Sequence, residues 1–244
     1  MPHIHAPRKA TETMEGAGVT VRRLMPVPQF MNFDPFVLWD HFTIDAGTGF
    51  PDHPHRGFEA ITYMFEGRMQ HTDNLGNQST VPAGGAQRFT DGRGIVHSAM
   101  PADNASSPGI QFWINLPQRL KHIEPAYHQV DSAGIPERHQ GQVVVRDIVG
   151  MDSPLHLQTR VRYADVTLDA GEEFSELINK DFRGFIYVVE GELVIAGREL
   201  DAGYAAFMED TGLLKISAKQ KSRFMICFGA AHHEPIKQYG PFVD

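Results

Sequence analysis

Cysteine is almost absent from this chain, since Cys227 is the only one in 244 residues. No disulfide can therefore form within the chain, so its stability must come from packing and hydrogen bonding. Cys227 lies in the apolar run RFMICFGA, which favours an inert buried thiol over a reactive one. Chains without disulfides are typical of a reducing compartment, so we expect a cytoplasmic protein.

Long apolar runs and an excess of positive charge are also missing. No run approaches the ~20 apolar residues needed to cross a bilayer, and the first residues lack the apolar stretch of a secretory signal. Thirty acidic and 22 basic side chains give a formal net charge of −8. We therefore expect no membrane span and no direct binding of nucleic acid. The polar N-terminal segment with His3 and His5 is predicted to be a frayed end.

The sequence is rich in short apolar runs separated by turn residues. Val, Ile, Phe and Tyr recur between Gly, Pro, Asn and Asp, which is typical of many short strands joined by turns. Helical periodicity is hard to find outside residues 118–127. The pattern predicts an all-β protein built as a sandwich or barrel. The clearest predicted strands cover residues 58–65, 110–116, 143–149, 185–189 and 223–228.

The two halves of the chain repeat one order of motifs. GFEAITYMFEG at residues 57–67 is matched by GFIYVVEG at 184–191. VPAGGAQRF at residues 81–89 is matched by LDAGYAAF at 200–207. Because both pairs occur in the same order, duplication of one strand-rich unit is a better explanation than chance.

The segment FPDHPHRGFE contains two histidines at a spacing that suits metal binding. His53 and His55 lie two residues apart, so on an extended strand both imidazoles point to one face, ~7 Å apart along the backbone. Two such nitrogens can bind one ion at about 2.0–2.1 Å if a third ligand completes the site. Unless a bulge intervenes, the same alternation predicts that Glu59 points inward, near the pair. The alternatives are hydrogen-bonded strand histidines and, for Glu59, a salt bridge with Arg56 or another cation.

The second half lacks this chemistry. Counting back from Gly191 by the interval that separates Gly67 from the histidine pair leads to Leu177 and Asn179, which bind metals poorly. We place the junction in the polar stretch around residues 131–142. The predicted domains are therefore 1–135, with the metal site, and 136–244, without one.

Several of these segments resemble known motifs. The spacing of Gly47, His53, His55 and Glu59 is similar to the first cupin motif, although its closing Gly67 comes one residue late. FDPFVLWDHF, FPDHPHRGFE, GRGIVHSAMP and EPIKQYGPFV more narrowly resemble the pirin family. That resemblance implies a bicupin, in which two antiparallel, jelly-roll-like β-barrels follow each other in tandem.

The resemblance also implies a ligand set. Pirin-family proteins bind a metal, usually iron, through the two histidines of the HPH motif, a later histidine and a glutamate two residues beyond it. In this chain those positions are His53, His55, His97 and Ala99. Since alanine cannot bind a metal, the site would have three neutral imidazoles and open positions that suit an anionic, chelating ligand. Iron(II) is the expected ion, with zinc, manganese, nickel and copper as alternatives.

Other polar residues are assigned supporting roles. Gln87 stands where other cupins have a fourth ligand histidine, and it is expected, with Gln111, to be a pocket or core group that needs hydrogen-bond partners. His71 lacks a partner at ligand spacing, so a surface or structural role is expected for it. Glu59 would have to act as the catalytic base if the glutamate ligand is absent.

Three functions are consistent with these features. The resemblance implies an oxidoreductase of the quercetin 2,3-dioxygenase type, which uses one metal ion and a small aromatic, flavonoid-like ligand. The first alternative is a non-enzymatic, iron-dependent regulatory protein with a protein partner. The second is a bicupin scaffold that has lost its metal.

Overall fold

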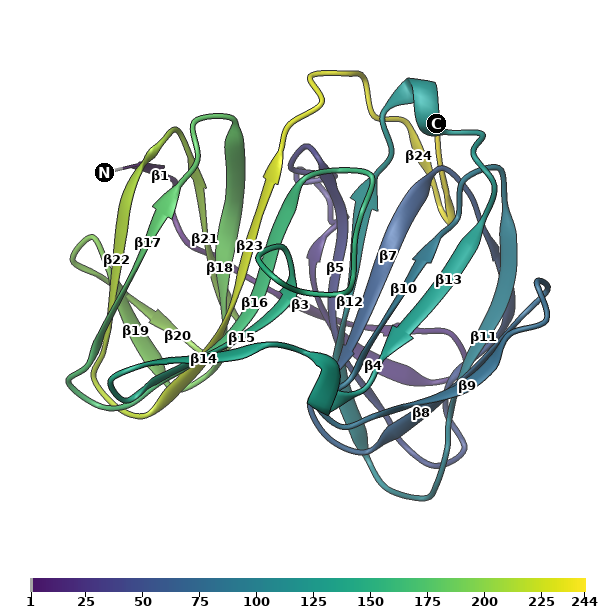
Figure 1. The fold of residues 1–244 in the computed structure, drawn as a ribbon, viewed down its shortest axis with the longest axis horizontal. Helices are drawn as coiled ribbons and strands as arrows, with labels where there is room; N and C mark the ends of the chain where they lie inside the picture. The colour runs from purple at the N-terminus through teal and green to yellow at the C-terminus, as the bar shows by residue number, and fades with distance from the viewer. Residues whose placement is uncertain (1) are drawn as a thin grey trace. The chain divides into compact units, whose positions relative to one another are not determined.

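The computed structural model describes residues 2–244, which form mainly β-strands (Figure 1). Neighbouring strands of every sheet pair antiparallel. Within the described chain the helical segments are two 3-10 turns, η1 (Gln118–Leu120) and η2 (Ser132–Gly134). No helix among residues 2–244 has the length and apolar character that crossing a bilayer requires. The all-β prediction is confirmed, whereas the strands form separate sheets, so two closed barrels remain unconfirmed.

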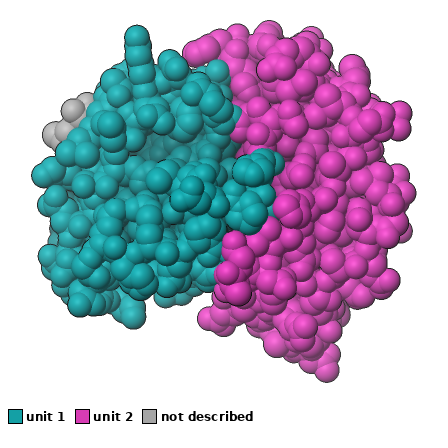
Figure 2. All heavy atoms as spheres, viewed as in Figure 1, with its two compact units in different colours: residues 1–10, 135–156, 160–231 teal, residues 11–134, 157–159, 232–244 magenta. Residues whose placement is uncertain are grey.

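The chain divides into two compact units whose segments interleave along the sequence (Figure 2). Unit 1 contains the N-terminal residues up to Ala10 together with residues 135–156 and 160–231. Unit 2 contains residues 11–134, 157–159 and 232–244. The division into domains at residues 135 and 136 stays a prediction, because compactness alone does not show which segments fold independently.

Unit 2 is built from two main sheets. The larger has seven strands in the order β13-β10-β7-β12-β5-β4-β3, and the smaller has four in the order β6-β11-β8-β9. The bounds of the larger sheet are β13 (Ala126–Val130), β10 (Ala86–Thr90), β7 (Phe58–Met64), β12 (Ser107–Asn115), β5 (Phe36–Ile44), β4 (Val19–Met25) and β3 (Thr11–Glu15). Those of the smaller are β6 (Phe50–His55), β11 (Ile95–Pro101), β8 (Arg68–Asp73) and β9 (Gln78–Pro82). The C-terminal segment adds the hairpin of β24 (Gln238–Tyr239) and β25 (Phe242–Val243).

Unit 1 repeats this topology. Its larger sheet runs β1-β21-β18-β23-β16-β15-β14, with β2 also paired to β21, and its smaller sheet runs β17-β22-β19-β20. The predicted motif repeat lies on equivalent strands, because β7 and β18 hold the same place in the two orders, as do β10 and β21. The larger sheet has the bounds β1 (His3–Ile4), β2 (Arg8–Lys9), β21 (Tyr204–Glu209), β18 (Phe182–Glu190), β23 (Ser222–Ala230), β16 (Val161–Leu168), β15 (Val143–Val149) and β14 (Glu137–Gln140). The smaller sheet has the bounds β17 (Glu173–Ile178), β22 (Gly212–Ala218), β19 (Glu192–Ile195) and β20 (Arg198–Asp201).

The cores follow from the alternation of side chains along these strands. On β16, Ala164, Val166 and Leu168 share one face and join a single apolar cluster in unit 1. On β7, all seven residues are buried, and Ala60 and Met64 enter two different apolar clusters of unit 2. A strand covered on both faces needs apolar or fully paired side chains throughout, which the run FEAITYM largely provides.

The N-terminal segment is not frayed, so that prediction was wrong. His3 and Ile4 pair with Glu209 and Met208 of β21, and the backbone N–H of His5 donates to the carbonyl of Phe207 at 2.9 Å. The pairing satisfies backbone groups at the edge of the sheet, which local polarity in the sequence does not reveal.

Gly184 on β18 provides a test of how closely the strands of unit 1 pack. A β-carbon at this position would overlap the carbonyl oxygen of Cys227 on the neighbouring β23. We expect Gly184→Ala to lower the free energy of unfolding by roughly 2–4 kcal/mol, measured by urea denaturation. Ser175→Ala, on an exposed position of β17, serves as the control with a change below about 0.5 kcal/mol. Equal stabilities of the two variants would show that this contact is not tight.

Candidate metal centre

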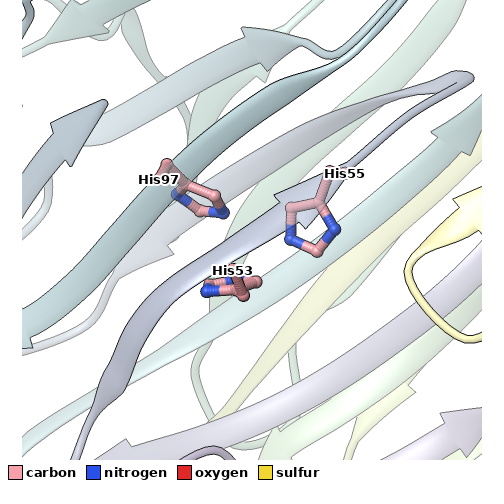
Figure 3. A group of neighbouring side chains, drawn as sticks. All are labelled: His53, His55 and His97. Atoms are coloured by element: carbon pink, nitrogen blue, oxygen red, sulfur yellow. The ribbon is translucent and has the colours of Figure 1, made fainter. Parts of the chain in front are cut away.

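Three histidine side chains gather on two neighbouring strands of unit 2 (Figure 3). β6 and β11 pair antiparallel, with His97 opposite His53 and Ile95 opposite His55. The ring centroid of His53 lies 4.6 Å from that of His55 and 4.4 Å from that of His97, and the centroids of His55 and His97 are 5.0 Å apart. The structure thus brings together the three histidines that the sequence suggested, from strand alternation for two of them and from family resemblance for the third.

The surroundings hold these imidazoles neutral. Burial lowers the pKa of His55 to about 3, with a smaller contribution from His53, and burial lowers the pKa of His97 well below its usual value. The pKa of His53 is also lowered by burial. His53 Nδ1 lies 2.7 Å from the carbonyl oxygen of Pro51, to which it can donate, so its Nε2 keeps a free lone pair. Neutral rings with free lone pairs are the form in which histidine binds metals.

The donor set fits a metal ion. One ligand nitrogen from each ring can be chosen so that all lie within 4.8 Å of one another, and no carboxylate joins this group within residues 2–244. Both ring nitrogens of His97 and Nδ1 of His55 are buried without a hydrogen-bond partner. Buried polar nitrogens without partners cost free energy, which a bound cation would recover.

A cavity of about 320 Å³ adjoins the three rings. Its lining is mostly apolar, which suits a small organic ligand. Apart from the three histidines, the lining residues are Glu15, Arg23, Pro26, Met31, Leu38, Asp40, Phe42, Phe50, Thr62, Met69, Ala99, Gln111, Trp113, Gln238, Gly240 and Pro241. The last three come from the C-terminal segment, whose part in the site the sequence did not indicate.

The other predicted pocket residues take two different places. Ala99 and Gln111 line the cavity, and Ala99 stands two residues beyond His97 on β11. Gln87 is fully buried behind the cavity, where it donates from Nε2 to Thr62 Oγ1 at 3.1 Å and accepts from the Tyr127 hydroxyl at 3.0 Å. Gln87 therefore has the hydrogen-bond partners expected of a buried amide, and Gln111 Oε1 accepts from Thr62 Oγ1 at 2.7 Å.

Glu59 does not lie where alternation predicted. It does not line the cavity, and its carboxylate accepts hydrogen bonds from Thr90 Oγ1 at 2.8 Å and from the backbone N–H of Gln158 at 2.7 Å. The chain turns at Gly57, where φ is +87°, as it passes from β6 into β7 of the other sheet. Alternation counted along β6 is lost at this turn. The predicted inward placement is wrong, and Glu59 is not positioned as a base for a ligand in the cavity.

His71 lies beside the three-histidine group, although it neither belongs to that group nor lines the cavity. It is fully buried on β8, with its ring 5.4 Å from that of His97 and stacked on Tyr127 at 4.3 Å. Its Nε2 lies 3.1 Å from Asp73 Oδ2, which fixes the ring. The sequence feature that suggests a fixed ring is Asp73, two residues later on the same strand. Only the pairing of β8 with β11 places His71 beside the cluster.

Comparisons with known proteins identify relatives over nearly the whole chain. The family model described as Pirin matches residues 18–114, and that described as Pirin C-terminal cupin domain matches residues 163–244. A pirin-like protein of Caulobacter vibrioides is 38% identical over 247 residues, covering 96% of this chain and 90% of that protein.

Two solved structures are similar in fold. A quercetin 2,3-dioxygenase from Acinetobacter baumannii has a TM-score of 0.91 at 24% identity, and the match covers 100% of this chain and 92% of that chain. Bacterial pirin YhhW from Escherichia coli, solved in complex with nickel(II), has a TM-score of 0.78 at 26% identity. That match covers 94% of this chain and 99% of the other. The match to the dioxygenase, at 24% identity, shows similarity of fold alone. The match to YhhW shows that a protein of similar fold was solved with a bound metal ion.

Glu59 belongs to a buried acidic pair with Asp91. Both carboxylate oxygens of Asp91 are buried without a hydrogen-bond partner, and its exposed fraction is 0%. Burial raises the pKa of Asp91 well above its usual value, and the charge of Glu59 adds to the effect. Burial also raises the pKa of Glu59, although its hydrogen bonds from Thr90 and Gln158 oppose the shift.

Asp91 should make the folded chain less stable as pH rises. Because its folded pKa exceeds the unfolded value near 3.9, the folded state keeps a proton that the unfolded state releases, so stability falls above about pH 4. We expect Asp91→Asn to raise the free energy of unfolding at pH 7 by at least about 1 kcal/mol and to flatten its pH dependence. Urea denaturation at pH 5 and pH 7.5 measures both effects, with Asp45→Asn on an exposed residue as control. A destabilised Asp91→Asn variant would mean that the ionised carboxylate has a partner.

Proposed function

This chain belongs to the pirin family of cupin proteins, and from this premise we propose that it is a metal-dependent oxidoreductase of the quercetin 2,3-dioxygenase type. We propose that His53, His55 and His97 hold one divalent ion beside the cavity. The observation that carries the proposal is a cluster of three neutral imidazoles, without a carboxylate among the described residues, beside a mostly apolar cavity.

Iron(II) is the ion we favour. Imidazole ligands suit iron, nickel, zinc and copper, so the donor set limits the choice to metals of this kind and does not distinguish between them. The bacterial pirin with 26% identity was solved in complex with nickel(II), which supports a metal ion in this chain as well. A bound redox-active ion would supply the electron exchange with O₂ that oxygenation of an aromatic ring requires.

The chain's own residues bind and orient the organic ligand. Trp113, Phe42 and Phe50 line the cavity and offer flat apolar surface to an aromatic ring. Because the three imidazoles carry no charge, a ligand that approaches the ion as an anion would meet no fixed negative group among the metal ligands. Glu59 is hydrogen-bonded elsewhere, so it does not take a proton from the ligand's reactive oxygen.

The substrate class is proposed from the cavity and not from the quercetin dioxygenase neighbour, because at 24% identity that likeness concerns the fold. A cavity of about 320 Å³ is at the lower end of the range for small-molecule sites. It suits a small planar ligand. A flavonoid-like aromatic meets this description.

His53→Ala is expected to abolish both metal retention and quercetin-dependent oxygen uptake. Loss of one of three ligands leaves two imidazoles, which bind a divalent ion far more weakly. Elemental analysis of protein purified without a histidine tag measures the metal, and an oxygen electrode measures the uptake. His122→Ala, on an exposed residue, is the matched control. Metal binding without oxygen uptake in the unaltered protein would favour the regulatory function, and absence of metal would favour the scaffold.

Ala99→Glu is expected to tighten metal binding at least tenfold, because it adds a carboxylate that lines the cavity two residues from His97. Competition with a chelator of known affinity at pH 7.5 measures the change. Ala99→Gln has the same length without the charge and is expected to bind close to the unaltered protein. If Ala99→Glu and Ala99→Gln bound the ion equally, position 99 would not reach the metal.

A further inference from the structure

A row of polar side chains crosses the larger sheet of unit 2. Arg23, Asp40, Gln111, Thr62 and Gln87 lie on five adjacent strands and are paired in register, each with the next. We call these five residues the polar row. Apolar clusters lie on the same face to either side, with Phe42 and Met64 in one and Leu38, Ala60 and Trp113 in the other. Four of the five residues line the cavity, and Gln87 lies behind it.

The hydrogen bonds along this row run in one direction. Gln87 Nε2 donates to Thr62 Oγ1 at 3.1 Å, so the hydroxyl hydrogen of Thr62 is available for a second hydrogen bond. Thr62 Oγ1 donates to Gln111 Oε1 at 2.7 Å. On the other side, the Tyr127 hydroxyl shares its one hydrogen between Gln87 Oε1 at 3.0 Å and Gln129 Oε1 at 3.1 Å, and Ser79 Oγ lies 2.5 Å from the same hydroxyl. Burial raises the pKa of Tyr127 to about 12, so this hydroxyl keeps its hydrogen.

This direction decides which end of the Gln111 amide faces the cavity. Gln111 Oε1 is occupied by the Thr62 hydroxyl, so the amide cannot turn without losing that bond. The Gln111 side chain lines the cavity, and its Nε2 makes no hydrogen bond to a described residue. Donors linked in a chain polarise one another, which strengthens the last member.

We infer that Gln111 recognises the cavity's ligand by donating a hydrogen bond from Nε2 to a neutral oxygen acceptor, such as a ring carbonyl. Thr62 and Gln87 are positioning residues that hold the amide in this orientation. This assignment rests on the proposed function in that it takes the cavity to be a ligand site.

The acceptor is neutral because Arg23, the cation in the cavity lining, is already paired with carboxylates. Arg23 Nε and Nη2 donate to Asp40 at 2.8 and 2.6 Å, and its Nη1 donates to Glu15 at 2.7 Å. Two carboxylates therefore surround the one guanidinium, which disfavours an anionic group beside Gln111. The ligand's anionic group belongs at the three histidines, so the two ends of the cavity select different oxygens.

Two probes of matched shape test the inference. 2-Acetylnaphthalene and 2-ethylnaphthalene share an aromatic frame and differ by one carbonyl oxygen, and equilibrium dialysis gives the dissociation constant of each. We expect the unaltered protein to bind the ketone about fivefold more tightly. The measured ratio is the dissociation constant of 2-ethylnaphthalene divided by that of 2-acetylnaphthalene. Gln111→Glu and Gln111→Leu both remove the donor, and each should reduce this ratio to about one. Thr62→Val should reduce it at least twofold.

The ratio separates recognition from a structural role. A variant that merely disturbs the cavity weakens both probes alike and leaves the ratio unchanged. Thr43→Val makes the same substitution on β5 at a half-buried position of the opposite face, and it should keep the unaltered ratio. A ratio near one in the unaltered protein, no saturable binding of either probe, or an unchanged ratio in Gln111→Leu would each overturn the inference.

Failure of the proposed function gives a different result. If quercetin-dependent oxygen uptake were absent while the ketone preference depended on Gln111, the inference would stand and the dioxygenase chemistry would fall. If oxygen uptake depended on His53 while the ratio did not change in the Gln111 variants, the dioxygenase chemistry would stand and the inference on Gln111 would be overturned.

Discussion

Antiparallel pairing of β6 with β11 is the constraint on which the candidate site depends, because it sets His97 directly opposite His53. Alternation along β6 then adds His55 on the same face, so three imidazoles meet with ring centroids 4.4 to 5.0 Å apart. A shift of the register by one residue would turn His97 to the other face. β8 on the other side of β11 adds His71 to the same neighbourhood, fixed by Asp73.

The charge of the site follows from the same packing. Burial lowers the pKa of His53, His55 and His97, so the cluster is neutral without having to release protons. Three carboxylates of unit 2 near the site have other partners: Asp40 and Glu15 pair with Arg23, and Glu59 accepts from Thr90 and Gln158. A cation held here would depend on its incoming ligand for charge balance, which links metal binding to ligand binding.

The polar row explains how the larger sheet carries polar groups through an apolar interior. A buried amide or hydroxyl without a partner costs free energy, and here each interior member gives or accepts a bond along the row. Within the row the hydrogen bonds lead from Gln87 through Thr62 to Gln111 beside the cavity, and Tyr127 bonds to Gln87 from outside the row. Stability of the sheet and recognition of a ligand thus use the same hydrogen bonds, since the orientation that satisfies the interior also fixes the donor that faces the cavity.

The strands, the repeat of motifs on equivalent strands of the two larger sheets, and the shared face of His53 and His55 could all be predicted from the sequence, because each depends on alternation or spacing within a short segment. Family resemblance, and not spacing, indicated His97 and Ala99. The remaining features depend on contacts between strands. Alternation carried past the turn at Gly57 misplaced Glu59, and neither His71 nor the polar row could be recognised before the strand register was known. Register arises from contacts between residues far apart in the chain, which no local pattern specifies.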